Sequence, residues 1–424
     1  MKKAEINSRQ NIAIIVGIII AIIRLSLIGV ITSHDTGSYS YAWDSLSLGG
    51  IVGIFRTPIY PAILKVAYWL FGIENGMFFV VLLQNILFVL SISFFYTLAH
   101  HFVKSEKIVL VLSVIYAISP IYGVWHNVIY TESFALSGMT FFVYFTVKYY
   151  EERKTADAII LFFITFFLLF LRPINVYLLP ILAVCILIGY YRKKNIKFLL
   201  VGLGCVAILS STLFIYMFGY KQKYGIFAPS DVSLINKFVI LRQHNLIGLQ
   251  DAEDTELRAT MKRVISETDF ESQKFWEKNI VTLFETKKPN LKAISRMIDN
   301  AIASNSAQWN KLIIERFKES AVDNLLNKEI DPWGLSNKIY IPLFIIYLII
   351  GVFGAFWTYW TCTNHSIPTG STLILMLTVS NIIVAVYGGY QDWGRLVAPS
   401  VPLFLLSAGI VWEIVQDPQN VTLI

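Results

Sequence analysis

Long, uninterrupted apolar runs are the feature of this sequence that most limits how it can fold. The runs are about 15–21 residues long, close to the length that an α-helix needs to cross the hydrocarbon core of a bilayer. The strands of a membrane barrel would alternate in polarity, and these runs do not. Because backbone groups inside a bilayer must be paired within the protein, the runs predict membrane-spanning helices.

Composition agrees with a polytopic membrane protein. Hydrophobic residues make up 56% of the 424 residues and charged residues only 15%. Soluble domains are usually about 45–50% apolar and about 25% charged. The net charge of +7 is explained by Lys and Arg in loops that face the cytoplasm, so no nucleic-acid partner is expected. The three cysteines show no paired spacing, which indicates neither a disulfide framework nor a zinc site.

About ten spans are expected in an all-α membrane protein. The basic N-terminus is placed inside, and the first span is expected at 12–31 without cleavage. Residues 59–72 are apolar but short, so they predict an interfacial helix. The remaining spans are expected at 77–98, 108–124, 133–148, 158–171, 176–190, 198–217, 339–360, 371–388 and 400–415.

Residues 219–338 differ from the rest of the chain. They hold 18 Lys/Arg and 16 Asp/Glu, and their apolar spacing is helical. This pattern predicts a helical segment on the extracytoplasmic face. The domain organisation is therefore an N-terminal transmembrane region at 1–218 with a loop at 32–61, the helical segment at 219–338, and a C-terminal transmembrane region at 339–424.

Ionisable residues recur in the turns that this topology places outside. They are Asp35, Asp44, Arg56, Glu132, Arg172, Asp392 and Arg395. Charged groups near the membrane are costly unless they are paired or face water, and outside arginines run against the positive-inside trend. Two interpretations remain open. The residues could tie the outer ends of the helices together by salt bridges, or they could form a shared cavity that binds an anionic lipid headgroup and catalyses a transfer.

Several short motifs occur in order along this outer face. They are Asp35-Thr36-Gly37-Ser38-Tyr39, Arg56-Thr57-Pro58-Ile59-Tyr60-Pro61, Tyr130-Thr131-Glu132, Arg172-Pro173, and Arg395 with Pro399 and Pro402. The set resembles the C-type integral-membrane glycosyltransferases that use polyprenyl-phosphate sugars, such as protein O-mannosyltransferases and lipid A aminoarabinose transferases. The resemblance covers about the first 180 and the last 40 residues, and 219–338 resembles no family that we can name.

This resemblance implies a role for each matching residue. Asp35 would be the base that accepts a proton from the acceptor. Arg56 would be the first ligand of the donor phosphate, because guanidinium binds phosphate bidentately, and Arg172 and Arg395 would be further ligands. Glu132 could orient the acceptor, hold an arginine or serve as the base. Four residues are predicted to contact the sugar or the acceptor: Tyr39, Tyr60, His126 and Asp392.

No metal or other cofactor is assigned. Many members of the family carry Asp-Glu where this chain has Asp35-Thr36, and His34 and His126 lack the spacing of a ligand set. A divalent metal stays an open alternative.

The implied function is transfer of a sugar from a polyprenyl-phosphate donor to a lipid, glycan or protein acceptor. The expected location is a bacterial or archaeal plasma membrane, with the active site on the extracytoplasmic face. A polysaccharide polymerase or ligase acting on polyprenyl-linked glycans is the alternative, and the long segment 219–338 keeps it open. A transporter is less favoured because internal repeats are not visible. A non-catalytic scaffold would not need acids and arginines in several separate turns.

Overall fold

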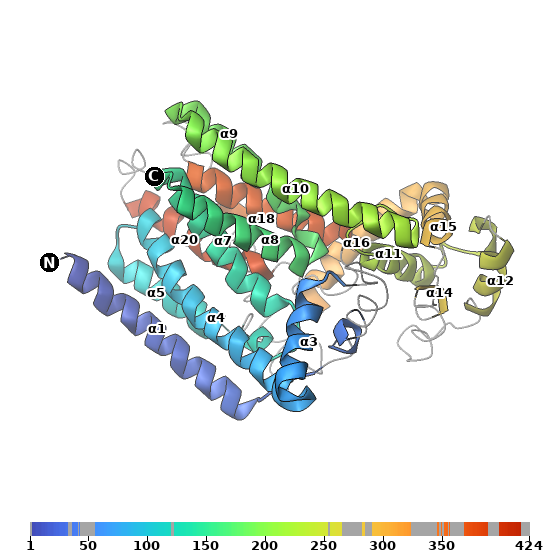
Figure 1. The fold of residues 1–424 in the computed structure, drawn as a ribbon, viewed down its shortest axis with the longest axis horizontal. Coiled ribbons are helices and arrows are strands. Elements are labelled where there is room, and N and C mark those ends of the chain that lie inside the picture. Colours follow the sequence, from blue (N-terminus) through green and yellow to red (C-terminus); the bar gives the residue numbers. More distant parts are fainter. Residues whose placement is uncertain are drawn as a thin grey trace.

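The computed structural model describes residues 2–32, 36–40, 42, 56–119, 123–252, 255–264, 282–284, 291–323, 346, 349, 352–354, 356, 369–388 and 398–416. Within these ranges the chain is helical, and its only extended pairing is an isolated bridge (Figure 1). The predicted all-α architecture is confirmed.

The membrane region contains ten α-helices within the described residues. They are α1 (Lys2–Leu27), α3 (Ile59–Phe71), α4 (Ile73–Phe102), α5 (Glu106–Ile118), α7 (Glu132–Glu152), α8 (Thr155–Leu171), α9 (Leu178–Lys193), α10 (Ile196–Tyr224), α18 (Thr369–Gly388) and α20 (Val401–Gln416). Among the described residues, four segments are long and apolar enough to cross a membrane: Ser8–Leu27, Ile73–Phe102, Pro173–Arg192 and Ile196–Tyr224. The expected total of about ten spans stays a prediction, because most of the span expected at 339–360 lies outside the described residues.

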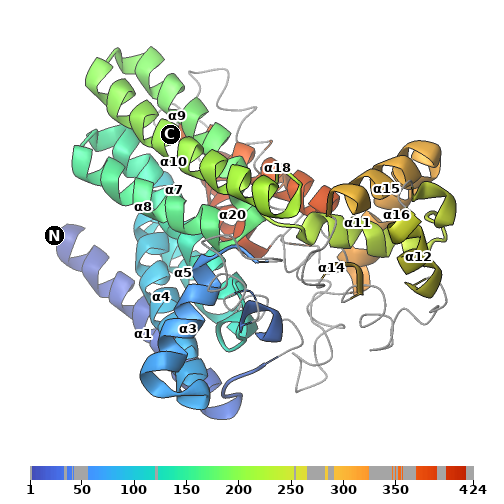
Figure 2. The same ribbon diagram turned by 45° about the vertical axis from the view of Figure 1, so that its right-hand side comes forward.

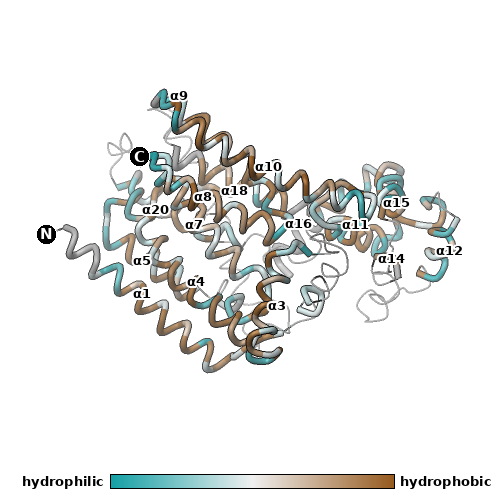
Figure 3. Tube along the Cα trace, viewed as in Figure 1, coloured by the Kyte–Doolittle hydropathy of each residue, from teal (hydrophilic) through white to brown (hydrophobic). Residues whose placement is uncertain are grey.

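The helix α4 lies at the centre of the N-terminal half, where it packs against α1, α3, α5 and α7 (Figure 1). Its Phe88, Ile92 and Phe95 are buried in the main apolar core. On the outside of the bundle, apolar side chains such as Ile15 and Ile22 of α1 remain exposed. Brown, apolar stretches run along most of these helices and teal residues gather near their ends (Figure 3). This distribution suits a bundle whose outer surface faces lipid.

Gly72 alone separates α3 from α4. Its φ of 77° lies in the left-handed region, which glycine adopts without strain. The helix α3 therefore ends and reverses within one residue, and it packs back along α4. The second predicted span, placed at 77–98, begins earlier in the structure, at Ile73.

The described part of 219–338 forms a helical unit beyond the end of α10 (Figure 2). It contains α11 (Val232–Gln243), α12 (Thr255–Val264), α14 (Thr282–Phe284), α15 (Leu291–Ser304) and α16 (Ser306–Asp323). The unit has an apolar core of its own, to which Phe238, Phe284, Ile298 and Trp309 contribute together with Tyr220 of α10. The domain boundaries at 218 and 338 remain predictions.

Candidate functional site

The beginning of the first loop is fixed to the turn that precedes α7. Ile31 and Val128 form the isolated parallel bridge, in which Ile31 N donates to Asn127 O at 2.9 Å and Ile129 N donates to Ile31 O at 3.0 Å. Farther along the loop, the Thr36 hydroxyl donates to Ile129 O at 3.5 Å. These bonds hold the described start of the loop close to the N-terminal end of α7.

A buried ion pair lies at that end of α7. Glu132 is the first residue of α7, and Arg172 directly follows the last residue of α8. Arg172 Nη2 is 3.4 Å from Glu132 Oε1, and the two side chains are only 7% and 1% exposed. Arg172 Nη1 is buried and has no hydrogen-bond partner among the described residues. The structure therefore brings together two of the predicted site residues, and it leaves one guanidinium nitrogen able to donate to a ligand.

Arg56 lies in a second group of predicted residues, just before α3. Its Nε donates to Ser38 Oγ at 2.9 Å, and its guanidinium carbon lies 4.5 Å from the centre of the Tyr39 ring. The Tyr39 ring meets the Tyr60 ring edge-on at 4.8 Å. Tyr60 in turn meets the ring of Phe134, two residues after Glu132, at 5.8 Å. A chain of ring contacts thus connects Arg56 to the first turn of α7.

Two amides in α4 were not predicted and organise this region. Tyr60 is fully buried, and its hydroxyl donates to Gln84 Oε1 at 3.1 Å. Gln84 Nε2 donates to the carbonyl oxygens of His126 and Val128, at 3.1 and 2.9 Å. Asn85 Nδ2 also donates to His126 O, at 3.0 Å. Two adjacent amides in an otherwise apolar run were the signal in the sequence that could have revealed them, because buried polar groups need partners.

His126 is placed in the protein core. Its ring is fully buried and stacks on Phe88 at 4.1 Å, while its Nδ1 and Ser133 Oγ lie 2.6 Å apart. Burial, and then the positive charge of Arg24, hold the pKa of His126 well below its usual value. The ring is therefore neutral at neutral pH. Its predicted contact with the sugar or the acceptor stays a prediction.

A polar network joins the C-terminal helices to this end of the bundle. The 3-10 helix η2 (Pro173–Tyr177) begins directly after Arg172. Its last residue, Tyr177, donates from its hydroxyl to Asn381 Oδ1 at 3.3 Å. Asn381 Nδ2 donates to Ser400 Oγ at 2.7 Å. Ser400 belongs to η5 (Ala398–Ser400), which contacts α7. The C-terminal turn is thereby held against α7, and through Asn381 it is linked to η2, which follows Arg172.

Three of the predicted site residues lie outside the described residues, namely Asp35, Asp392 and Arg395. The same holds for His34 and Asp44. Within the described ranges, no group of three or more His, Cys, Asp or Glu side chains could hold a metal ion.

Two guanidinium groups among the described residues have the chemistry to bind an anion. Arg56 and Arg172 are guanidinium groups, which bind phosphate oxygens with two parallel hydrogen bonds. The Arg56 guanidinium lies over the Tyr39 ring, and Glu132 supplies a buried carboxylate beside Arg172.

Comparison with known proteins relates the chain to solved structures by fold. No family model matches the chain, and no curated protein matches it. The archaeal oligosaccharyltransferase AglB from Archaeoglobus fulgidus, in complex with an inhibitory peptide and a dolichol-phosphate, is similar with a TM-score of 0.54 and 12% identity, over 99% of this chain and 52% of that chain. The apo form of the Archaeoglobus fulgidus oligosaccharyltransferase has a TM-score of 0.51 and 12% identity, over 98% and 52% of the two chains.

The chain spans about half the length of these proteins, covering 52% of each. At this identity the likeness shows a shared fold. It agrees with the predicted all-α polytopic membrane architecture, which these oligosaccharyltransferases share.

Proposed function

We propose that this protein is a membrane glycosyltransferase that moves a sugar from a polyprenyl-phosphate donor to a lipid, glycan or protein acceptor at the extracytoplasmic face. The observation that carries the proposal is the buried Glu132–Arg172 pair beside the anchored first loop, with an unpartnered guanidinium nitrogen among the described residues. The shared fold supports it, because the structure of the archaeal oligosaccharyltransferase contains a dolichol-phosphate.

The arginines hold the phosphate of the donor. Arg172 donates from Nη1 while Glu132 keeps its Nη2 in place, so the guanidinium is positioned before the donor binds. Arg56 contributes a second guanidinium, which the Tyr39 ring and Ser38 orient. Arg395 is the third proposed ligand. Cations that are positioned in advance stabilise the negative charge that develops on the leaving phosphate.

Asp35 is the proposed base. It directly precedes Thr36, whose hydroxyl bonds to Ile129 three residues before Glu132, and this connection supports its assignment to the same site. The acceptor hydroxyl or amine gives its proton to Asp35 and attacks the anomeric carbon of the sugar. The bond from that carbon to the phosphate oxygen breaks, and the polyprenyl phosphate leaves with both bonding electrons. Glu132 holds Arg172 in this scheme and is the alternative base.

The sugar and the acceptor are assigned to the aromatic side of the site. Tyr39, Tyr60, His126 and Asp392 are the proposed contacts. Tyr60 is fully buried and held in one orientation by Gln84, and its ring supports that of Tyr39. The proposal thus comprises three statements: the protein transfers a sugar, an acceptor receives it, and the reaction takes place at a plasma membrane.

A transfer assay on purified protein in liposomes tests the function. Donors would be a panel of polyprenyl-phosphate monosaccharides together with a polyprenyl-linked oligosaccharide. Sugar transfer from a monosaccharide donor, with release of polyprenyl phosphate, is the expected result. Transfer of only the oligosaccharide would instead favour the polymerase or ligase alternative. If polyprenyl-phosphate donors do not bind at all, the proposed site is wrong.

A further inference from the structure

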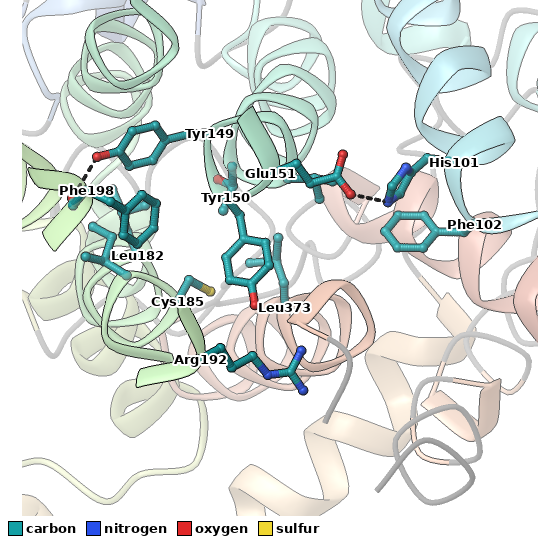
Figure 4. Close-up of a pocket in the computed structure, with 13 residues that line it drawn as sticks. His101, Phe102, Tyr149, Tyr150, Glu151, Leu182, Cys185, Arg192, Phe198 and Leu373 are labelled. Atoms are coloured by element: carbon teal, nitrogen blue, oxygen red, sulfur yellow. Dashed lines mark hydrogen bonds and ion pairs between the residues drawn. The ribbon is translucent and has the colours of Figure 1, made fainter. Parts of the chain in front are cut away.

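A pocket opens at the other end of α7, far from Glu132. It lies where α4, α7 and α9 end and where α10 and α18 begin (Figure 4). Its cavity volume is about 90 Å³, and the pocket is open to solvent on one side. A cavity of this volume can hold one part of a ligand, with the remainder at the open side. The glycosyl-transfer site proposed above does not use it.

One part of the pocket is apolar. Its side chains are almost fully buried and come from α9, α10 and α18; they are Leu182, Cys185, Ile186, Phe198 and Leu373. The walls are fixed to one another. Tyr149 of α7 donates from its hydroxyl to Phe198 O of α10, at 2.8 Å. These apolar walls are therefore held together without a ligand.

The other part of the pocket is polar and charged. Glu151 Oε1 lies 3.0 Å from His101 Nε2, so this carboxylate faces a partner on α4 (Figure 4). Arg192, near the end of α9, is exposed and lines the pocket on the side away from that pair. The Tyr150 hydroxyl lies between Arg192 and the apolar part in the same view. The pocket is thus lined by a guanidinium as well as by apolar side chains.

An anionic membrane lipid combines a charged headgroup with apolar chains, which match the charged part and the apolar part of this pocket. Leu187 of α9 and Leu200 of α10 follow the lining residues Ile186 and Phe198 by one and two positions, and they are 49% and 65% exposed. Apolar side chains that are exposed on spanning helices face lipid, so the helices that line the pocket also contact the bilayer. Guanidinium groups bind phosphate bidentately, and basic pockets between membrane helices recognise anionic headgroups.

We propose that this pocket binds one anionic phospholipid, with its phosphate on Arg192 and an acyl chain on the surface formed by Leu182, Cys185 and Phe198. The binding of a membrane lipid here is independent of the proposed glycosyl transfer. The two proposals use opposite ends of α7, so either can fail without the other.

Native mass spectrometry of the purified full-length protein tests the selectivity. The probes are phosphatidylglycerol and phosphatidylcholine with the same acyl chains. Wild type should retain one phosphatidylglycerol at concentrations at which it retains no phosphatidylcholine. Arg192→Gln should weaken phosphatidylglycerol binding about tenfold, as expected for one charge-assisted contact. Arg192→Lys should recover part of it.

Lys194→Gln is the matched control. It removes the same charge from the same helix end, but Lys194 packs over Tyr190 and Tyr191 and does not line the pocket. Its phosphatidylglycerol affinity should stay close to that of wild type. Equal losses in Arg192→Gln and Lys194→Gln would contradict the proposal, because they would indicate general attraction to a basic surface.

Cys185 reports occupancy of the pocket itself, without any change to Arg192. The chain has three cysteines, so the Cys205→Ser/Cys362→Ser variant leaves Cys185 as the sole thiol. Its modification by N-ethylmaleimide should be slower in nanodiscs with phosphatidylglycerol than in nanodiscs with phosphatidylcholine alone. Equal rates in the two would overturn the proposal. Equal protection by inorganic phosphate in phosphatidylcholine nanodiscs would also overturn it, since no acyl chain would be required.

Discussion

Replacement of Arg172 by Met separates the structural role of the Glu132–Arg172 pair from its proposed role as a phosphate ligand. The two side chains are 1% and 7% exposed, and the ionic atoms are 3.4 Å apart. Breaking a buried pair from one side typically costs about 3–5 kcal/mol, because the remaining charge loses its partner. With an unfolding entropy of about 2.1 cal/mol/K per residue, this loss lowers the apparent Tm of a 424-residue chain by about 3–6 °C.

The double variant Glu132→Gln/Arg172→Met carries the test. It has no buried charge at this position, so its Tm should recover most of the loss. Affinity for a polyprenyl-phosphate donor should not recover, because the guanidinium is still absent. We expect donor binding in Arg172→Met and in the double variant to be about ten- to a hundredfold weaker than in wild type. Thermal unfolding and donor titration of all four proteins in one detergent would provide both measurements.

A second ion pair on α7 offers the control. Lys148 Nζ lies 3.1 Å from Asp157 Oδ1, whose side chain is 4% exposed, near the opposite end of the helix. Lys148→Met should therefore lower the Tm and leave donor affinity unchanged. The reasoning would be refuted if the double variant recovered donor affinity together with stability. Arg172 would then only connect the ends of α7 and α8.

Three further predictions address the other assignments. Arg56→Ala should weaken donor binding about ten- to a hundredfold and Arg56→Lys much less, as measured by titration; unchanged affinity in Arg56→Ala would make this residue a lipid anchor. Asp35→Asn should lower turnover about 10²- to 10⁴-fold with donor binding retained, whereas a near-normal rate together with an inactive Glu132→Gln would identify Glu132 as the base. In cysteine-free protein, Lys311→Cys should react with an impermeant thiol reagent from outside intact cells and Lys193→Cys should not, and the reverse pattern would invert the proposed topology.

Much of the bundle could be predicted from hydrophobicity alone. An apolar run needs no information about its neighbours to become a helix in lipid, since its backbone pairs within itself. The helix α8 illustrates this, because its predicted span of 158–171 ends at the residue where the helix ends. The end is set locally, by Arg172 and Pro173 after a long apolar stretch.

Features that depend on contacts between distant segments could not be predicted in the same way. The pairing of Glu132 with Arg172 joins residues 40 positions apart. From the sequence, salt bridges between the outer helix ends were one of two interpretations of these charges, beside a shared anion-binding cavity. Gln84 and Asn85 were passed over because they lie inside an apolar run, and only the fold shows that they meet the carbonyl of His126. Of the residues proposed to bind the donor phosphate, Arg56 and Arg172 lie within the part of the chain that the structure describes. The role of each remains a prediction.

The length of α10 has a consequence for how the extramembrane helical unit is oriented. The helix has 29 residues, so it is about 43 Å long, which exceeds the thickness of the hydrocarbon core by about 13 Å. Leu209 and Leu213 pack in the bundle, and about two turns after Leu213 the same unbroken helix contributes Tyr220 to the core of the unit. The rotation of the helical unit about the α10 axis and its distance from the bundle along that axis are therefore both fixed. One residue inserted between Leu213 and Tyr220 would rotate it by about 100° and raise it by about 1.5 Å, whereas seven inserted residues would restore its direction to within about 20° at a height about 10 Å greater. Chains that share this bundle can thus differ in helix length at this point only in steps of whole turns if the unit is to face the same way.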